Sequence, residues 1–302
     1  MGEVTKDIEL LHKDEYSYKT ITQYVQDMYR FFKLNSSGKL LNDIFTKSFS
    51  PIGTELFDSV INTPKEKRKV AEYFFAKNYF RQAYETFENI SGSDPDCEVF
   101  QKMGYAMMKS GDYEKALDNF LKALLFDDRQ PWTLKKTAFC YRKLKNPEKA
   151  IEYYKLAEAQ DNDNLAVAAA IGRCYMDMEN YTEALKYFFK VDYLDASNFK
   201  NCRPLAWCSY KAGKYEQALK YSQKPPEKEK IAEDYILQAN IYRKFNDIEK
   251  AVAAYEKALE FENYTVENLE NAIKKDYALE ESDPEYNNLL FDYIMYKNSK
   301  QL

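Results

Sequence analysis

Three cysteines at equal intervals are the first candidates for chemistry in this chain. Cys140, Cys174 and Cys208 lie 34 residues apart, and the chain has five cysteines in all. Clustered thiolates bind metals or exchange disulfides, but there is no CxxC pair and the single histidine, His12, is remote in sequence. Equal spacing is also expected where stacked repeats place small apolar side chains one period apart. We therefore interpret the cysteines as structural and expect no metal and no cofactor.

Residues that commonly catalyse reactions do not form a known motif. His12 lies in a polar stretch, where a solvated side chain is expected. The carboxylate pairs Asp127-Asp128 and Glu280-Glu281 fall at expected helix ends, where solvation or capping explains them. The chain has no glycine-rich phosphate loop, HExxH sequence or nucleophile elbow. We expect a protein that is not an enzyme and has no catalytic residues.

The elements that would position any binding residues are indicated by an alanine that recurs every 33 or 34 residues. The recurring residues are Ala83, Ala116, Ala150, Ala184, Ala218 and Ala251. With this alanine at column 20 of a 34-residue unit, column 8 is small throughout: Ala71, Gly104, Ala138, Gly172, Ala206 and Ala239. Column 24 is aromatic in five units of six, at Phe87, Phe120, Tyr154, Phe188 and Tyr255. Small columns facing large ones are what two packed helices require.

These columns resemble the tetratricopeptide repeat family over about two thirds of the chain. The clearest unit contains Phe100, Gly104 and Met107, followed by Gly111 and Ala116. The first column has no tryptophan, and the proline that usually closes a unit is missing from several units. Helix ends can be capped in other ways, so the fold expectation is unchanged.

The resemblance implies an all-α fold, a right-handed superhelical solenoid of about six helix-turn-helix repeats with helical caps at both ends. We expect an amino-terminal helical cap or divergent repeat at 1–63 and carboxy-terminal capping helices at 265–302. The six repeats between them, 64–264, are expected at 64–96, 97–130, 131–164, 165–198, 199–231 and 232–264. Pro225 and Pro226 should shorten the second helix of the fifth repeat.

The resemblance also places a binding surface, because columns 2, 5, 9, 12 and 13 line the inner, concave face in this family. Those columns hold twelve basic and four acidic residues, whereas the whole chain carries a net charge of −5. Both tryptophans of the chain are among them. We predict a groove for an acidic, extended protein segment, since arginine pairs with carboxylates and tryptophan supplies rigid contact area. The predicted groove residues are Tyr105, Met108, Trp132, Lys135, Phe139, Arg142, Arg173, Met176, Arg203, Trp207, Tyr210, Lys211 and Arg243.

One sequence-based test of this groove is the double change Arg173→Glu and Arg203→Glu. It is expected to abolish partner capture and to leave the melting temperature nearly unchanged.

Two alternatives remain open. The expected last helix, from Pro284 to about Lys297, is apolar nearly all round, so it should fold back on the array or mediate docking or homo-oligomerisation. RNA binding is disfavoured by the pI of about 5.3, although basic and aromatic residues alternate in the groove. No run of 18 apolar residues appears and the amino terminus is too polar for a secretory signal. We therefore expect a cytoplasmic adaptor or scaffold without a membrane span.

Overall fold

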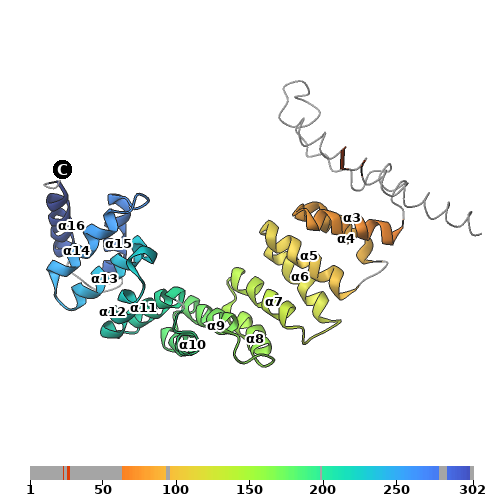
Figure 1. Cartoon of the computed structure of the whole chain (residues 1–302), viewed down its shortest axis with the longest axis horizontal. Helices are drawn as coiled ribbons and strands as arrows, with labels where there is room; N and C mark the ends of the chain where they lie inside the picture. The colour runs from red at the N-terminus through yellow and green to blue at the C-terminus, as the bar shows by residue number, and fades with distance from the viewer. Residues whose placement is uncertain are drawn as a thin grey trace, which may run out of the picture. The chain divides into compact units, whose positions relative to one another are not determined.

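The computed structural model describes residues 23, 26–27, 63–92, 96–197, 199–278 and 284–299, which include fourteen complete α-helices and no strand (Figure 1). The chain divides into two compact units, residues 1–86 and 87–302. The predicted amino-terminal cap at 1–63 lies outside the described residues, apart from residues 23, 26, 27 and 63. That cap remains a prediction.

The first unit contains α3 (Pro64–Ala76) and the beginning of α4 (Phe80–Ser91), joined by a turn at residues 77–79. A capping box starts α3, because the Thr63 side chain accepts the Glu66 amide and the Glu66 carboxylate accepts the Thr63 amide. Ala71 is fully buried and Phe74 nearly so. Ala71 occupies column 8, which the repeat period predicts to lie against the second helix.

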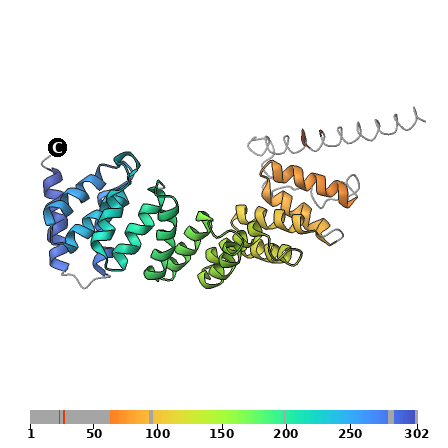
Figure 2. The same ribbon diagram turned by 60° about the horizontal axis from the view of Figure 1, so that its bottom comes forward.

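The second unit is a run of five helical hairpins, each packed on the next (Figure 2). The hairpins are α5 (Cys97–Ser110) with α6 (Tyr113–Leu124), α7 (Pro131–Lys143) with α8 (Pro147–Glu158), α9 (Leu165–Asp177) with α10 (Tyr181–Leu194), α11 (Cys202–Lys211) with α12 (Tyr215–Gln223), and α13 (Ala232–Lys244) with α14 (Ile248–Leu259). The second helix of each pair also contacts the first helix of the next. The all-helical solenoid predicted from the period is confirmed.

The core of these hairpins follows the predicted small and large columns. The recurring column-20 alanines of the second unit are fully buried: Ala116, Ala150, Ala184, Ala218 and Ala251. A Cβ atom added to Gly104 would lie 2.8 Å from the Phe120 ring, and one added to Gly172 would lie 2.9 Å from the Phe188 ring. Both rings have no exposed surface. Glycine therefore lets the ring of the second helix lie directly against the backbone of the first.

The turn inside each hairpin is equally regular. Column 15 has a positive φ, between 56° and 85°, in all six repeats: Asn78, Gly111, Lys145, Glu179, Gly213 and Asn246. The following residue caps the second helix in four units, where the side chains of Asp112, Asn146, Asn180 and Asp247 accept an amide hydrogen bond. A left-handed residue followed by an N-cap thus ends one helix and starts the next within two positions.

Two short 3-10 helices mark the less regular fifth repeat. One, η1 (Phe199–Asn201), precedes α11, and the other, η2 (Glu227–Glu229), follows α12. Helix α12 ends at Gln223, directly before Lys224-Pro225-Pro226, so the predicted shortening is confirmed. The missing turn of helix is replaced by the η2 segment.

The carboxy-terminal helices α15 (Val266–Ala278) and α16 (Pro284–Ser299) close the apolar end of the array. Leu290 and Ile294 of α16 are buried against Leu269 and Ile273 of α15 in a cluster shared with α13 and α14. The predicted fold-back of the last helix is therefore confirmed for this face. Another set of α16 side chains stays exposed: Leu289 at 68%, Tyr293 at 53% and Tyr296 at 57%.

The contact between Gly172 and the Phe188 ring is directly testable. We expect Gly172→Ala to destabilise the protein by about 1–3 kcal/mol, because the added methyl group displaces a buried ring in a packed core. Urea denaturation followed by circular dichroism measures this change.

Gly92→Ala is the matched control, since no atom lies within 4 Å of the added Cβ atom there. Equal stability of the two variants would contradict the close approach of the helices.

Candidate functional site

The predicted groove residues come from α5, α7, α9, α11 and α13, the first helices of the hairpins. Within this set α5 contacts α7, and α11 contacts α13. Helix α13 also contacts α15, which is not part of the set. Side chains of the predicted columns also cross from one first helix to the next. We call the surface made by columns 2, 5, 9, 12 and 13 of these five helices the first-helix face.

Aromatic rings from α5 and α7 meet on the first-helix face. The Tyr105 and Trp132 ring centroids are 6.1 Å apart, and the Trp132 indole also meets the buried Phe120 ring edge-on at 5.8 Å. Lys136 Nζ lies 5.7 Å from the Tyr105 centroid and 5.6 Å from the Trp132 centroid. Trp132 keeps 39% of its surface exposed. The indole is therefore held in place by packing and still available for contact.

Further lysines surround these rings. Lys109 Nζ lies 5.4 Å from the Tyr105 centroid, and Lys143 Nζ lies 5.5 Å from the Phe139 centroid. In the described part of the chain no carboxylate forms an ion pair with Lys109, Lys135, Lys136 or Lys143. We call Tyr105, Lys109, Trp132, Lys135, Lys136, Phe139 and Lys143 the lysine–aromatic cluster. Three of its four lysines, Lys109, Lys136 and Lys143, lie over aromatic rings, which leaves their positive charges available to an anionic ligand.

Two arginines lie side by side where α7 meets α9. Arg142 forms a two-point ion pair with Asp177, with Nε–Oδ2 at 2.5 Å and Nη2–Oδ1 at 3.2 Å. Burial lowers the pKa of Arg142, but the hydrogen bond and charge of Asp177 outweigh it and the net pKa is raised. Arg173 has no ion pair within the described residues; burial around its guanidinium lowers its pKa, and the charge of Arg142 lowers it further. Arg173 therefore lacks an ion-pair partner among the described residues, whereas the neighbouring Arg142 has one in Asp177.

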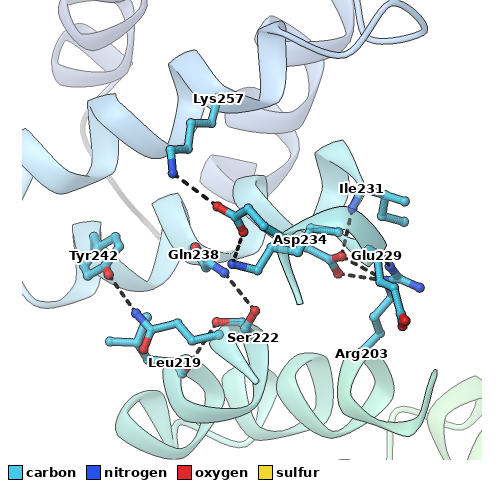
Figure 3. Close-up of polar contacts among 12 residues, drawn as sticks. Arg203, Leu219, Ser222, Glu229, Ile231, Asp234, Gln238, Tyr242 and Lys257 are labelled. Atoms are coloured by element: carbon cyan, nitrogen blue, oxygen red, sulfur yellow. Dashed lines mark hydrogen bonds and ion pairs between the residues drawn. The ribbon is translucent and has the colours of Figure 1, made fainter. Parts of the chain in front are cut away.

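A second arginine pair joins α11 to α13. Arg203 Nε donates to both carboxylate oxygens of Asp234, at 2.9 Å and 3.0 Å, and Nη2 donates to the Glu229 carbonyl (Figure 3). Asp234 is 6% exposed and also accepts the Ile231 amide at 3.0 Å. The hydrogen bond to Asp234 raises the pKa of Arg203. This pair fixes the joint between the fifth and sixth repeats.

Polar contacts hold the same joint where α12 is short. Gln238 Nε2 donates to the Ser222 carbonyl at 2.8 Å, and Lys257 Nζ lies 3.4 Å from Glu227 Oε1 (Figure 3). Hydrogen bonds from Lys230 and Tyr235 lower the pKa of Glu227 to about 2. The η2 segment is therefore attached to α13 and α14 by side-chain hydrogen bonds.

A pocket of about 420 Å³ opens among α11, α13 and α15. The residues around it are Arg203, Trp207, Lys211, Glu233, Asp234, Ile236, Leu237, Asn240, Tyr264 and Ala272. Trp207 is 38% exposed, and Lys211 Nζ lies 5.0 Å from its ring centroid. The pocket therefore combines an apolar wall with a lysine beside the indole.

The structure requires corrections to the predicted groove. Tyr210 is only 2% exposed and packs with Leu237 and Ile241 in the core, so its ring is not on the binding surface. Arg142 and Arg203 are on the first-helix face, but each already forms an ion pair, Arg142 with Asp177 and Arg203 with Asp234. The remaining predicted residues Met108, Met176 and Arg243 are half-buried, and Met176 packs on the core of the fourth repeat.

Lys136 and Asp234 are among the site residues that were missing from the prediction. Lys136 stands in column 6, one position from the predicted set, and its long side chain reaches two rings. Asp234 stands in column 3 of the sixth repeat, 31 residues after its partner Arg203. Opposite charges about one repeat apart are the signal that identifies such pairs.

The three equally spaced cysteines are part of the packed core. Cys140, Cys174 and Cys208 are fully buried, and burial raises the pKa of each thiol, to about 11 at Cys174 and about 12 at the other two. Across the described ranges no group of histidine, cysteine or acidic residues could hold a metal ion. The helices placed by the structure include none with the length and apolar character needed to span a bilayer.

Comparison with protein families identifies the repeats. Tetratricopeptide repeat models match residues 141–200 and 233–264. Together with the hairpin array, these matches show that the chain is a tetratricopeptide repeat protein. This fold is typical of proteins that bind or scaffold other proteins. No curated protein sequence matches the chain.

Solved structures agree on the fold. A tetratricopeptide repeat protein from Parabacteroides merdae is 18% identical, with a TM-score of 0.59 over 77% of this chain and 98% of its own. PilW, a type IV pilus biogenesis factor, is 20% identical, with a TM-score of 0.56 over 70% of this chain and 98% of its own. PilF of Pseudomonas aeruginosa is 19% identical, with a TM-score of 0.53 over 70% and 97%. At these identities the likeness extends to the fold alone.

Proposed function

We propose that this protein is a non-enzymatic adaptor that binds an acidic, extended segment of a partner protein along its first-helix face. The proposal is carried by one observation, the lysine–aromatic cluster of α5 and α7. Its lysines have no carboxylate partner among the described residues, and its rings are held in place by the core below them.

The energetics favour an anionic ligand at this surface. A hydrogen bond to a charged group contributes about 1.5–3 kcal/mol when it is partly desolvated. Tyrosine and tryptophan add contact area and lose little conformational entropy, because each has only two side-chain torsions. Arg173, one helix further along, extends the positive surface toward the Arg142–Asp177 pair. An extended segment running across α5, α7 and α9 would meet all of these groups.

The variant that best tests this surface is Lys136→Glu combined with Arg173→Glu. Arg203→Glu is unsuitable, because it would leave the buried Asp234 carboxylate without its partner and add a second negative charge beside it. The sequence-based expectation of an unchanged melting temperature therefore no longer applies to variants at Arg203. Lys136 and Arg173 have no ion pair within the described chain, so their replacement breaks no salt bridge.

The test uses a fluorescein-labelled decapeptide of alternating glutamate and glycine, with a glutamine-glycine peptide as the neutral reference. We expect the wild type to prefer the glutamate peptide, with affinity falling as salt rises. The double variant should bind it at least tenfold more weakly, because about 1.4 kcal/mol corresponds to a factor of ten. Fluorescence anisotropy measures both affinities.

Lys155→Glu with Lys220→Glu is the matched control, since it changes the net charge equally at exposed positions of the second helices. An equal loss in this control would show a general charge effect. Unchanged binding by the first-helix variant would contradict the proposal.

A second candidate function is docking through α16, as the sequence also suggested. The observation that favours it is the exposure of Leu289, Tyr293 and Tyr296, which share one side of the helix at spacings of four and three residues. Truncation near Leu279 is a poor test, because it would also remove Leu290 and Ile294 from the core.

Point substitution avoids that problem. If α16 mediates self-association, Leu289→Asp with Tyr293→Asp should convert an oligomer to a monomer in light scattering, with helicity unchanged. A wild-type protein that is already monomeric at high concentration would rule out homo-oligomerisation through this helix.

A further inference from the structure

The pocket among α11, α13 and α15 is independent of the lysine–aromatic cluster, which lies on α5 and α7. Its apolar wall comes from Trp207, Ile236, Leu237 and Ala272. The volume of about 420 Å³ falls within the range of roughly 300–1,000 Å³ in which ligand pockets are found. Most of the Trp207 ring is covered, and its 38% exposed surface is open to a ligand.

Two polar side chains of the wall, Asp234 and Asn240, already have hydrogen-bond partners. The Asp234 carboxylate accepts hydrogen bonds from Arg203 and from the Ile231 amide. Asn240 Oδ1 accepts the Tyr255 hydroxyl at 2.5 Å. Because these groups already have partners, the interior of the pocket favours an apolar side chain over a polar one.

Charge is unevenly distributed along the pocket. Glu233 and Asp234 stand at the beginning of α13 beside Arg203, so this end carries one excess negative charge. Lys211 is at the other end of α11, eight residues from Arg203, which corresponds to about 12 Å along a helix. The Lys211 ammonium contacts the Trp207 and Tyr210 rings and forms no ion pair within the described residues. The unmatched positive charge therefore lies beside the exposed indole.

We propose that this pocket holds an apolar anchor of the partner: a bulky aliphatic or aromatic side chain of an extended segment, with a carboxylate of the same segment bound by Lys211. This inference rests on the proposed function, because it assumes that the first-helix face binds a protein segment. It adds sequence selectivity to the acidic preference. Acidity alone brings a segment to the face, and the anchor residue determines its register.

The test is selection from a display library of random dodecapeptides on the full-length protein. Peptides that bind should contain leucine, isoleucine, methionine, phenylalanine or tryptophan within three residues of an aspartate or glutamate. Replacing that apolar residue by alanine in a selected peptide should weaken binding at least tenfold. Fluorescence anisotropy of the labelled peptide measures the loss.

The second part of the test uses protein variants that fill the pocket or reverse the charge beside it. Ala272→Trp should weaken the selected peptides at least tenfold, whereas Ala253→Trp, at an exposed position of α14, should leave binding unchanged. Lys211→Glu should act like Ala272→Trp, with Lys220→Glu on α12 as its control. Lys211 is half-buried at the pocket and its replacement does not fill the core, so this second pair is informative even if Ala272→Trp fails to fold by circular dichroism.

The fluorescence of Trp207 reports directly whether the pocket is occupied. In a Trp132→Phe background it is the single tryptophan of the chain, so its emission should shift as a selected peptide saturates. A saturable shift that requires the apolar residue supports the anchor site.

The outcomes separate the two proposals. Acidic peptides that bind without an apolar residue, and that bind Ala272→Trp normally, would overturn the anchor pocket and leave the proposed function standing. A library that yields no binding peptide would contradict both. Peptides that lose affinity only in Lys136→Glu with Arg173→Glu would likewise place recognition on α5 to α9 and reject the pocket.

Discussion

Close contact between a ring on the second helix of a hairpin and a small residue on the first is the constraint on which the first-helix face depends. At Gly104 and Gly172 the ring occupies the space where a Cβ atom would be. A helix has one side that can approach a neighbour this closely, so the contact fixes its rotation about its axis. The columns opposite the small residue then face away from the hairpin partner. The first-helix face is a consequence of this packing.

Some of the basic residues on that face form ion pairs within the protein, and others are available to bind a ligand. Arg142 and Arg203 bind Asp177 and Asp234 across successive first helices, and each pair links two repeats. Such pairs add orientation between repeats, while desolvation offsets part of their attraction. Lys136 and Arg173 have no such partner among the described residues. The excess positive charge suited to ligand binding is therefore smaller than the count of basic residues suggests, and it lies on α5, α7 and α9 and at Lys211 of α11.

The sequence was sufficient to predict what depends on period and side-chain size. The buried alanines, the five hairpins of the second unit and the early end of α12 before Pro225 follow from spacing and from local chain chemistry. The fold-back of α16 was one of two alternatives that its apolar sequence left open. The pairing of Arg203 with Asp234 was not predicted, because it depends on how far one first helix is displaced along the next. The burial of Tyr210 was missed for a similar reason. Its column is half-buried in the other repeats, and Leu237 and Ile241 of the following repeat cover it almost completely here.

The pocket beside Trp207 could not have been predicted either, since it requires three helices from successive parts of the chain to meet. Trp207 and Ile236 stand in columns 9 and 5, which the sequence assigned to the binding face. Leu237, Tyr264 and Ala272 were not assigned to it, because their contribution depends on the angle at which α15 closes the array. Column assignments identify the residues of a face, while its hollows depend on the packing between repeats.

Hydroxyl-radical footprinting of the free protein, analysed by mass spectrometry, tests the orientation of the first helices most directly. With the orientation described, Trp132 and Trp207 should be oxidised rapidly, whereas Tyr210 and Tyr255, at 2% and 0% exposed, should be protected until the protein unfolds. Rapid oxidation of Tyr210 together with protection of Trp207 would show that α11 is rotated relative to the structure. The binding face proposed for this protein would then be wrong.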